Sequence, residues 1–181
     1  DMVEQLLFKG ANPNTQDKDG MTALLHTAEK GYTETAAILI KGGAKLESQD
    51  KNGSTALIMA ADKGHTRIID LLLDSGADID AADNDGATAL IWAVGQDHID
   101  AAEKLIHRGA DVNKQDNDGV TALMEAASVR SADLVGLLLT HGADVEIKDG
   151  RGRTVNDIAR KRRNSGVIST LETYAEEHKI H

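Results

Sequence analysis

Two series of glycines recur every 33 residues along the chain, and this period constrains the fold more than any other feature of the sequence. In one series each glycine is followed two residues later by threonine: Gly20, Gly53, Gly86, Gly119 and Gly152. In the other each glycine is followed directly by alanine: Gly10, Gly43, Gly76, Gly109 and Gly142. A fixed period of roughly 20 to 50 residues is the signature of stacked structural units. The chain is therefore predicted to be a repeat array in which each unit contacts its neighbours.

The second complete unit shows what each period encodes. Thr55 is a good N-cap for a short helix that stops near Gly64, because glycine adopts the left-handed conformation without strain. Residues 66–75 place apolar side chains on one stripe of a second helix, which Gly76 ends. Residues 83–86, Asp-Asn-Asp-Gly, favour a projecting hairpin. Helices this short are unstable alone, so each unit must bury its apolar stripe against its neighbours.

The composition fits thin units packed with aliphatic side chains. The chain has no cysteine, which excludes disulfides, thiolate zinc sites and a cysteine nucleophile, and its aromatic residues are Phe8, Tyr32, Trp92 and Tyr174. No apolar run approaches the roughly 20 residues needed to span a bilayer, and no signal peptide is recognisable. We therefore expect a soluble, cytoplasmic protein with no membrane partner. The formal net charge of −10 argues against binding nucleic acid.

The pattern within one period resembles the ankyrin repeat. It reads Asp-x-x-Gly-x-Thr-x-Leu-x-x-Ala-Ala-x-x-Gly-His, then Leu-Leu-x-x-Gly-Ala-Asp, and residues 50–78 follow it best. The resemblance covers nearly the whole chain and implies an all-α fold, an ankyrin-repeat solenoid of stacked helix-turn-helix units with projecting hairpin loops. It divides one domain, residues 1–181, into a partial repeat at 1–16, full repeats at 17–49, 50–82, 83–115 and 116–148, and a C-terminal cap repeat at 149–181.

The sequence departs from the family pattern at three positions of the unit. Where the family has Thr-Pro-Leu-His, this chain has Thr-Ala-Leu followed by an aliphatic residue: Leu25, Ile58, Ile91 or Met124. Alanine is the best helix former, so the helix is retained while an apolar ladder replaces a polar contact between units. The first helix stops at glycine in two units but at Asp97 and Arg130 in the next two. Arginine in the left-handed conformation costs about 1 kcal/mol, which predicts the loosest turn at Arg130.

The two ends of the array differ from its middle. Residues 2–9 match a second helix with no first helix before it, so we expect the native chain to continue upstream. At the other end, residues 154–161 and 167–171 keep the helical register, and the outer positions from Glu172 to Lys179 are mostly polar. Polar substitution on the last unit is typical of a cap, because no neighbour covers its outer face.

Charge is distributed unevenly along the array. Residues 151–163 contain six basic residues and one acidic residue, whereas residues 1–150 carry a net charge of −13. The basic cluster at 160–163 suits the C-terminal end of a helix, where cations complement the helix dipole. The same cluster leaves nuclear import open as an alternative to a cytoplasmic location.

Candidate catalytic and metal sites fail on residue type or on spacing. An EF-hand loop with Gly86 at its sixth position would need acids where Ala81 and Trp92 stand. The sequence has no phosphate-binding glycine motif, no His-Glu-x-x-His and no nucleophile elbow. His65 and His98 recur at one position of the repeat, as structural turn residues do. We therefore predict no enzyme activity, no metal and no cofactor.

Function is expected where the units differ from one another. The resemblance implies a concave groove, lined by the first helices and the hairpin tips, that binds another protein or peptide. Trp92, beside Met59, is the candidate anchor, because tryptophan leads interface hot spots; the alternative is that Trp92 fills space between repeats that Gly95 leaves. The predicted partner-binding residues are Met59, Trp92, His26, Glu125, Met21, Lys30, Asp62, Lys63, Asp85, Gln96, Asp118, Arg151 and Arg153.

The predicted function is a non-catalytic scaffold for protein–protein interaction. Asp62, Asp85 and Asp118 favour a partner with basic surface residues that is attracted electrostatically. We expect the array to be a monomer. The alternative is that it is the regulatory or targeting domain of a larger enzyme or channel, which the missing first helix of the first unit favours.

Overall fold

The structure is a computed structural model that describes residues 2–178. Asp1 and residues 179–181, including Lys179 of the predicted cap, lie outside the described residues. Within residues 2–178 the regular elements are all helices: α1 (Met2–Phe8), α2 (Ala23–Lys30), α3 (Thr33–Lys41), α4 (Ala56–Asp62), α5 (Thr66–Asp74), α6 (Ala89–Gly95), α7 (Ile99–His107), α8 (Ala122–Val129), α9 (Ala132–Thr140), α10 (Val155–Arg162) and α11 (Ser165–His178).

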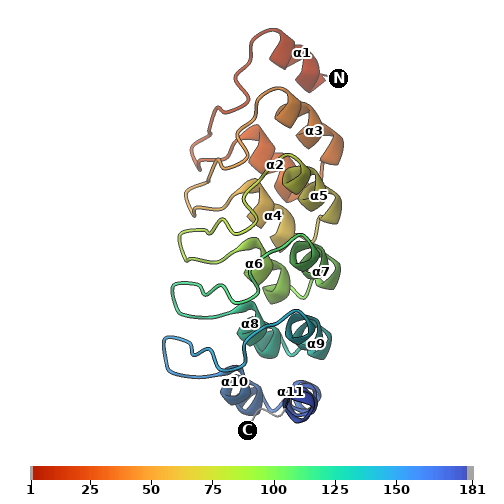
Figure 1. The fold of residues 1–181 in the computed structure, drawn as a ribbon. Helices are drawn as coiled ribbons and strands as arrows, with labels where there is room; N and C mark the ends of the chain where they lie inside the picture. Colours follow the sequence, from red (N-terminus) through yellow and green to blue (C-terminus); the bar gives the residue numbers. More distant parts are fainter. Residues whose placement is uncertain (1, 179–181) are drawn as a thin grey trace.

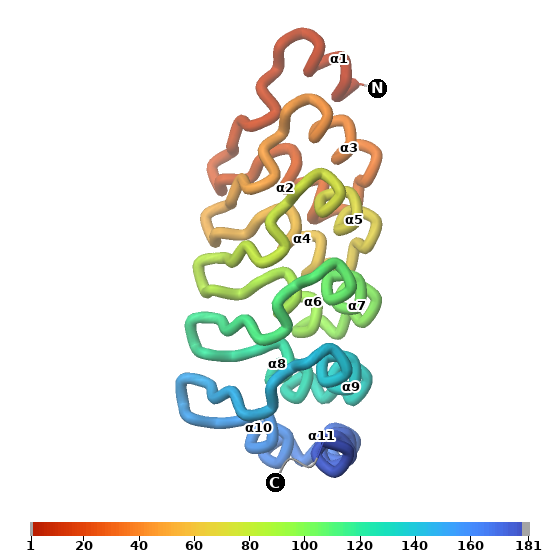
Figure 2. Tube along the Cα trace, viewed as in Figure 1, coloured from red at the N-terminus to blue at the C-terminus, as the bar shows by residue number. Residues whose placement is uncertain are grey.

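The helices stack in two columns (Figure 1). In the first column α2, α4, α6, α8 and α10 each contact the next, and in the second column α1, α3, α5, α7, α9 and α11 do the same. Each first-column helix also contacts the second-column helix that follows it in the chain, so α6 packs on α7 and α8 on α9. The connections between these pairs project as a ladder of loops from one side of the stack (Figure 2). The predicted all-α solenoid is confirmed.

Threonine begins each first-column helix, as the sequence predicts. The threonine hydroxyl accepts a hydrogen bond from the backbone N–H three residues later at four of these starts: Thr22, Thr55, Thr88 and Thr121. At the start of α10, Thr154 and Asp157 form a capping box. The backbone N–H of Thr154, followed by its hydroxyl, holds the pKa of Asp157 below its ordinary value. These bonds satisfy helix N–H groups that have no partner within the helix.

An aspartate organises each projecting loop. One of its carboxylate oxygens accepts two backbone N–H bonds, from residues two and four positions later, in the loops that begin at Asp17, Asp50, Asp83, Asp116 and Asp149. Neighbouring loops are also joined directly, because the backbone N–H of each tip donates to the carbonyl of the loop before it. Bridges between Ala82 and Thr88 and between Gln115 and Thr121 give two of these loops hairpin pairing.

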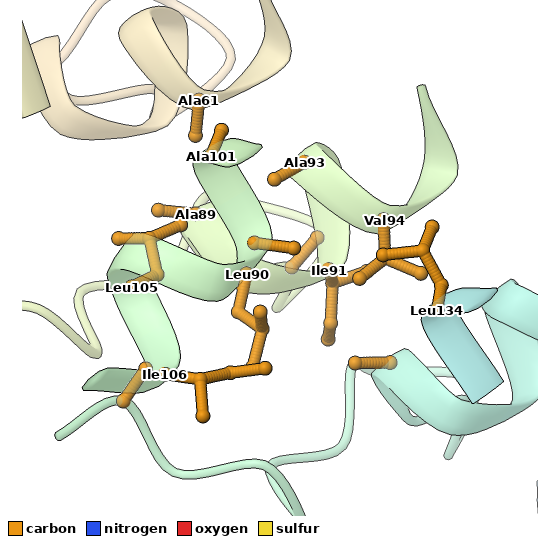
Figure 3. Packing of buried hydrophobic residues seen from close by; sticks show 14 of the residues in the cluster. Ala61, Ala89, Leu90, Ile91, Ala93, Val94, Ala101, Leu105, Ile106 and Leu134 are labelled. Carbon is orange, nitrogen blue, oxygen red and sulfur yellow. The ribbon is translucent and has the colours of Figure 1, made fainter. Parts of the chain in front are cut away.

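The core lies between the columns and consists of small and branched aliphatic side chains (Figure 3). In the third helix pair, Leu90 and Val94 of α6 and Leu105 of α7 are fully buried. The predicted apolar ladder is present, since the aliphatic residues that replace the family's histidine are all buried: Leu25, Ile58, Ile91 and Met124. The array therefore packs tightly without aromatic side chains in its centre.

The turns between paired helices explain the pattern of stop residues. Gly31 and Gly64 have positive φ, and a Cβ at either would lie 2.9 Å from the imidazole of His65 or His98. His98 Nε2 lies 3.0 Å from the carbonyl oxygen of Asp62, which supports the structural role predicted for the turn histidines. Asp97 and Arg130 adopt the same left-handed conformation. The residues one repeat after His98 are Ser131 and then Asn164, so these stops face no histidine.

The two ends of the stack differ in exposed apolar surface. On α1, Met2, Leu6 and Phe8 are exposed, with Phe8 93% accessible. On α11, the outer residues Glu172 and His178 are exposed while Leu171 is buried. None of the helices in residues 2–178 combines the length and apolar character that a membrane crossing requires.

Candidate functional site

The second carboxylate oxygen of the loop aspartate meets a different side chain in different units. In the first full unit His26 Nε2 lies 3.0 Å from Asp17 Oδ2. Nine residues after Asp83, the equivalent position holds Trp92, whose indole Nε1 donates to Asp83 Oδ2 at 2.8 Å. The position nine residues after each aspartate is therefore where the units vary around a constant loop.

In the fourth unit the same position places two acids near each other. Glu125 follows Asp116 by nine residues, where the three preceding units have histidine, methionine and tryptophan. Burial raises the pKa of the Glu125 carboxyl, the charge of Asp116 raises it further, and the charge of Arg162 lowers it. Across residues 2–178, neither Asp116 nor Glu125 has a basic side chain within ion-pair distance.

Trp92 and Glu125 line a cleft between the loops and the helices α6 and α8. The cleft has a volume of about 500 Å³, and no basic residue lines it. We call it the acidic cleft, and its lining residues are Asp85, Ala87, Ile91, Trp92, Gly95, Gln96, Asp116, Asn117, Asp118 and Glu125. Trp92 is half-buried, so its ring contributes apolar surface to a site that four carboxylates otherwise dominate.

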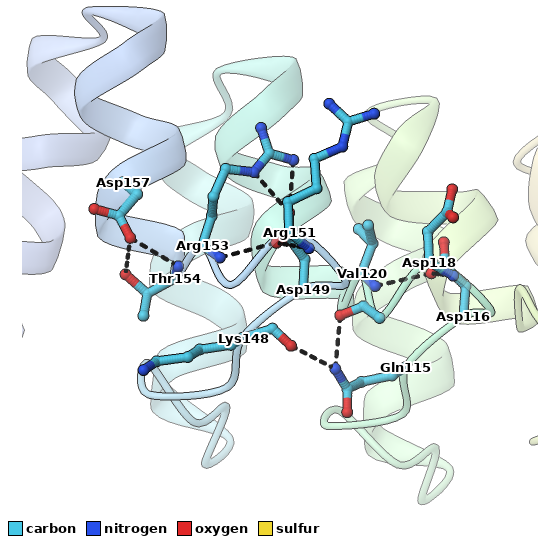
Figure 4. Close-up of polar contacts among 11 residues, drawn as sticks. Gln115, Asp116, Asp118, Val120, Lys148, Asp149, Arg151, Arg153, Thr154 and Asp157 are labelled. Carbon is cyan, nitrogen blue, oxygen red and sulfur yellow. Dashed lines mark hydrogen bonds and ion pairs between the residues drawn. The ribbon is translucent and has the colours of Figure 1, made fainter.

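A second cleft adjoins the first and carries the opposite charge. It has a volume of about 720 Å³ and lies between the loops and α8 and α10. We call it the basic cleft, and its lining residues are Asn117, Asp118, Val120, Ser128, Asp149, Gly150, Arg151, Arg153, Ile158, Lys161 and Arg162. Arg153 is held by Asp149, with its Nε 2.8 Å from Asp149 Oδ2 (Figure 4). Arg151, Lys161 and Arg162 form no ion pair with any described residue.

The structure brings together part of the predicted partner-binding set. The acidic cleft contains Asp85, Trp92, Gln96, Asp118 and Glu125, and the basic cleft contains Arg151 and Arg153 together with the shared Asp118. The other predicted residues line neither cleft: Met59, His26, Met21, Lys30, Asp62 and Lys63. The pairing of Met59 with Trp92 as one apolar centre is therefore not seen in this cleft.

Several of those remaining residues are engaged with neighbours. Asp62 accepts a hydrogen bond from Gln96 Nε2 at 2.8 Å and forms an ion pair with Lys63 at 2.8 Å. The hydrogen bond between Lys63 and Asp62, and then the negative charge of Asp62, raise the pKa of the Lys63 ammonium. Lys30 lies 3.3 Å from Glu29. Asp62 is thus an internal contact that fixes Gln96 at the edge of the acidic cleft.

The atoms that would lie nearest to a Cβ at Gly95 belong to Glu125, whose Cγ would be 3.5 Å away. Sequence reasoning missed Asp83 and Asp116 as the groups that Trp92 and Glu125 face. The signal was present, because both pairs are nine residues apart at one register of the repeat.

The clefts offer chemistry for recognition. Within residues 2–178, no group of three or more His, Cys, Asp or Glu side chains is arranged to hold a metal ion. The acidic cleft presents a fixed aromatic ring beside carboxylates. The basic cleft presents three cations, Arg151, Lys161 and Arg162, that form no ion pair with a described residue. Both arrangements are complementary in charge to ionised side chains of the opposite sign.

A comparison with known families agrees with the two-column architecture and the loop ladder. The family model of ankyrin repeats (3 copies) matches residues 1–83, 42–116 and 80–149. A comparison with curated proteins finds no match. Ankyrin repeats are generally protein–protein interaction modules and are generally non-catalytic. The repeated glycines, the threonine caps, the stacked helix pairs and this match together establish that the chain belongs to the ankyrin repeat family.

Proposed function

We propose that this chain is a non-catalytic scaffold that binds a protein or peptide on its loop side, with the acidic cleft as the centre of the interface. One observation carries the proposal: Trp92, the single tryptophan of the chain, lines this cleft half-buried and is fixed by the hydrogen bond from its Nε1 to Asp83. Buried aromatic anchors in pockets supply much of the affinity of protein interfaces.

The hydrogen bond to Asp83 favours binding through preorganisation. A side chain that is already held in one orientation loses little conformational entropy when a partner docks against it. Ile91, on the same helix, is buried and lines the cleft beside Trp92. The exposed Asp85 and Asp118 surround this apolar surface as a charged rim, which supports attraction of a partner with basic surface residues.

The test uses peptides selected from a random display library of 12-residue sequences against the wild-type chain. Each selected peptide is titrated while the fluorescence of Trp92 is recorded, because this residue is the single tryptophan of the chain. The affinity of the Trp92→Ala variant is measured with labelled peptides. We expect it to be about tenfold lower than that of the wild type, or lower still.

The matched control is Tyr32→Ala. Tyr32 is an exposed aromatic residue at the turn between α2 and α3, and it lines neither cleft. Its removal should leave peptide affinity unchanged, and circular dichroism verifies that both variants remain folded. If Trp92→Ala binds the selected peptides as tightly as the wild type does, the acidic cleft is not the binding site.

A further inference from the structure

The two adjoining clefts together suggest what kind of segment the loop side binds. Asn117 and Asp118 line both clefts, so the two sites form one continuous surface. On one side of this pair lie Glu125 and Asp85, and on the other lie Arg151 and Lys161. A single ligand that crosses Asn117 therefore meets a negative site and then a positive one.

We propose that the partner supplies an extended segment with a basic side chain and an acidic side chain about three residues apart. The lysine or arginine of this segment enters the acidic cleft between Trp92 and Glu125, and its aspartate or glutamate lies over Arg151 and Lys161 in the basic cleft. The inference rests on the proposed function and adds to it the chemistry and the orientation of the ligand.

The acidic cleft is suited to a cation in two independent ways. Trp92 offers an aromatic ring, which attracts an ammonium or guanidinium group and packs against its aliphatic stem. Four carboxylates line the cleft without a basic neighbour there, and Glu125 is partly buried beside Asp116. A cation between these two acids removes a repulsion that the unbound protein carries, which a neutral side chain cannot do.

The basic cleft is suited to an anion because only one of the cations discussed below, Arg153, forms an ion pair within the described residues. Arg153 is bound to Asp149, whose side chain is 2% exposed, and so belongs to the framework. Arg151 and Lys161 are exposed and have no ion pair within residues 2–178. Guanidinium and ammonium groups in this state bind carboxylates through charge-assisted hydrogen bonds.

The spacing of the two charges follows from the stacking of the repeats. The clefts are offset by one helix pair, and packed helices lie about 8–10 Å apart. An extended chain advances roughly 3.1–3.4 Å per residue. A segment that runs along the stack therefore spans from one cleft to the next in about three residues.

The experiment is a selection of 12-residue peptides against the wild-type chain, Glu125→Gln and Arg151→Gln. We expect wild-type selections to be enriched in a basic and an acidic residue about three positions apart. Glu125→Gln should lose the preference for the basic residue, and Arg151→Gln should lose the preference for the acidic one. Glu103→Gln is the control, because Glu103 is an exposed acid on α7 outside both clefts.

One selected peptide is then synthesised with each of its two charged residues replaced by glutamine. We expect Glu125→Gln to weaken binding of the charged peptide about tenfold, consistent with loss of one charge-assisted contact. The same variant should leave the affinity of the peptide that lacks the basic residue unchanged. Glu103→Gln should affect neither peptide.

The outcomes separate the two proposals. The inference is overturned if the selected peptides require Trp92 but show no paired charges. It is also overturned if Glu125→Gln and Glu103→Gln weaken peptide binding equally. Either result leaves the proposed scaffold function standing. Peptides whose binding does not depend on Trp92, or a library that yields no binder, contradict both proposals.

Discussion

Two neighbouring loops, residues 116–120 and 149–153, have the same pattern of backbone hydrogen bonds, but their aspartates make different side-chain contacts (Figure 4). In each, one carboxylate oxygen accepts two backbone N–H bonds at 2.8–2.9 Å. The other oxygen of Asp149 is bound by Arg153, whose Nε lies 2.8 Å away. The other oxygen of Asp116 receives no hydrogen bond from residues 2–178, and Glu125 lies near enough for its pKa to be raised by Asp116.

This difference shows how a repeat keeps its fold while its surface changes. The loop requires one carboxylate oxygen, and the second oxygen is available for a side chain that is specific to each unit. In the last unit that side chain is Arg153, which stabilises the loop of the cap by its ion pair with Asp149. In the unit before it is Glu125, which leaves an unpaired acid facing the acidic cleft.

The largest predicted loss of stability comes from substitutions at the turn glycine that both loops contain. Gly119 and Gly152 occupy the same turn position with φ of 76° and 74°. A Cβ on Gly119 would lie 2.9 Å from the backbone nitrogen of Gly150, whereas a Cβ on Gly152 would meet no atom within 4 Å. We expect Gly119→Ala to lower the free energy of unfolding by about 3 kcal/mol, and Gly152→Ala by about 1 kcal/mol.

Urea unfolding at neutral pH, followed by circular dichroism, measures both values. The Gly150 N–H donates to the carbonyl of Asp118 at 2.7 Å, and the alanine methyl group should push these two backbones apart. Gly152→Ala serves as the control for the conformational cost alone. Equal losses for the two variants would show that contact between the loops contributes nothing to stability.

The second prediction concerns the two aspartates themselves. Asp149→Asn should lower the melting temperature by several degrees, because the amide retains the backbone contacts but loses the charge-assisted bond to Arg153. Asp116→Asn should change it little, since that substitution also removes a repulsion with Glu125. Differential scanning calorimetry at neutral pH compares the two. A loss with Asp116→Asn as large as that with Asp149→Asn would contradict this account of the loops.

The pH dependence of the Asp149 effect provides a further check. The bond from Arg153, followed by the backbone N–H of Arg153, holds the pKa of Asp149 at about 2, below the ordinary value of 3.8. A lowered carboxyl pKa adds stability that is complete above the ordinary value and is lost as the pH falls through the folded value. The difference in stability between the wild type and Asp149→Asn should therefore shrink between about pH 4 and pH 2.

The fold was predictable from the sequence because its determinants are local and periodic. The threonine caps, the glycines with positive φ and the turn histidines each recur at one register, so an error in one unit is corrected by the others. The left-handed conformation of Arg130 was likewise predictable from Gly31 and Gly64. What the sequence did not show is why glycine is needed in some units, which depends on the imidazole that the next unit brings against it.

The site was less predictable because it depends on contacts between units. The bond from Gln96 to Asp62 joins residues 34 positions apart, and its existence depends on how far one unit is offset from the next. Trp92 could be singled out as the one tryptophan, but that Glu125 and not Met59 lines the cleft with it depends on the orientation of each side chain. The pairing of Trp92 with Asp83 was accessible in principle, since His26 and Asp17 have the same spacing.

The smallest predicted effect concerns Glu125, and its sign is opposite to that of Asp149. Burial, and then Asp116, raise the pKa of the Glu125 carboxyl, so the folded chain binds a proton more readily than the unfolded chain does. Ionisation of Glu125 at neutral pH therefore costs stability, and this cost disappears as the pH falls through the folded pKa. Arg162 opposes the shift, and the side chain is partly exposed, so the effect is limited.

We expect Glu125→Gln to be more stable than the wild type at neutral pH by less than about 1 kcal/mol, as for other partly exposed charge interactions. The gain should diminish as the pH is lowered toward 4, because the wild-type carboxyl is then protonated and resembles the amide. Urea unfolding at several pH values measures this, with Glu103→Gln as the control for loss of one exposed charge. A variant that is less stable at neutral pH would mean that Glu125 already has a cationic partner and is not available to a basic side chain of a ligand.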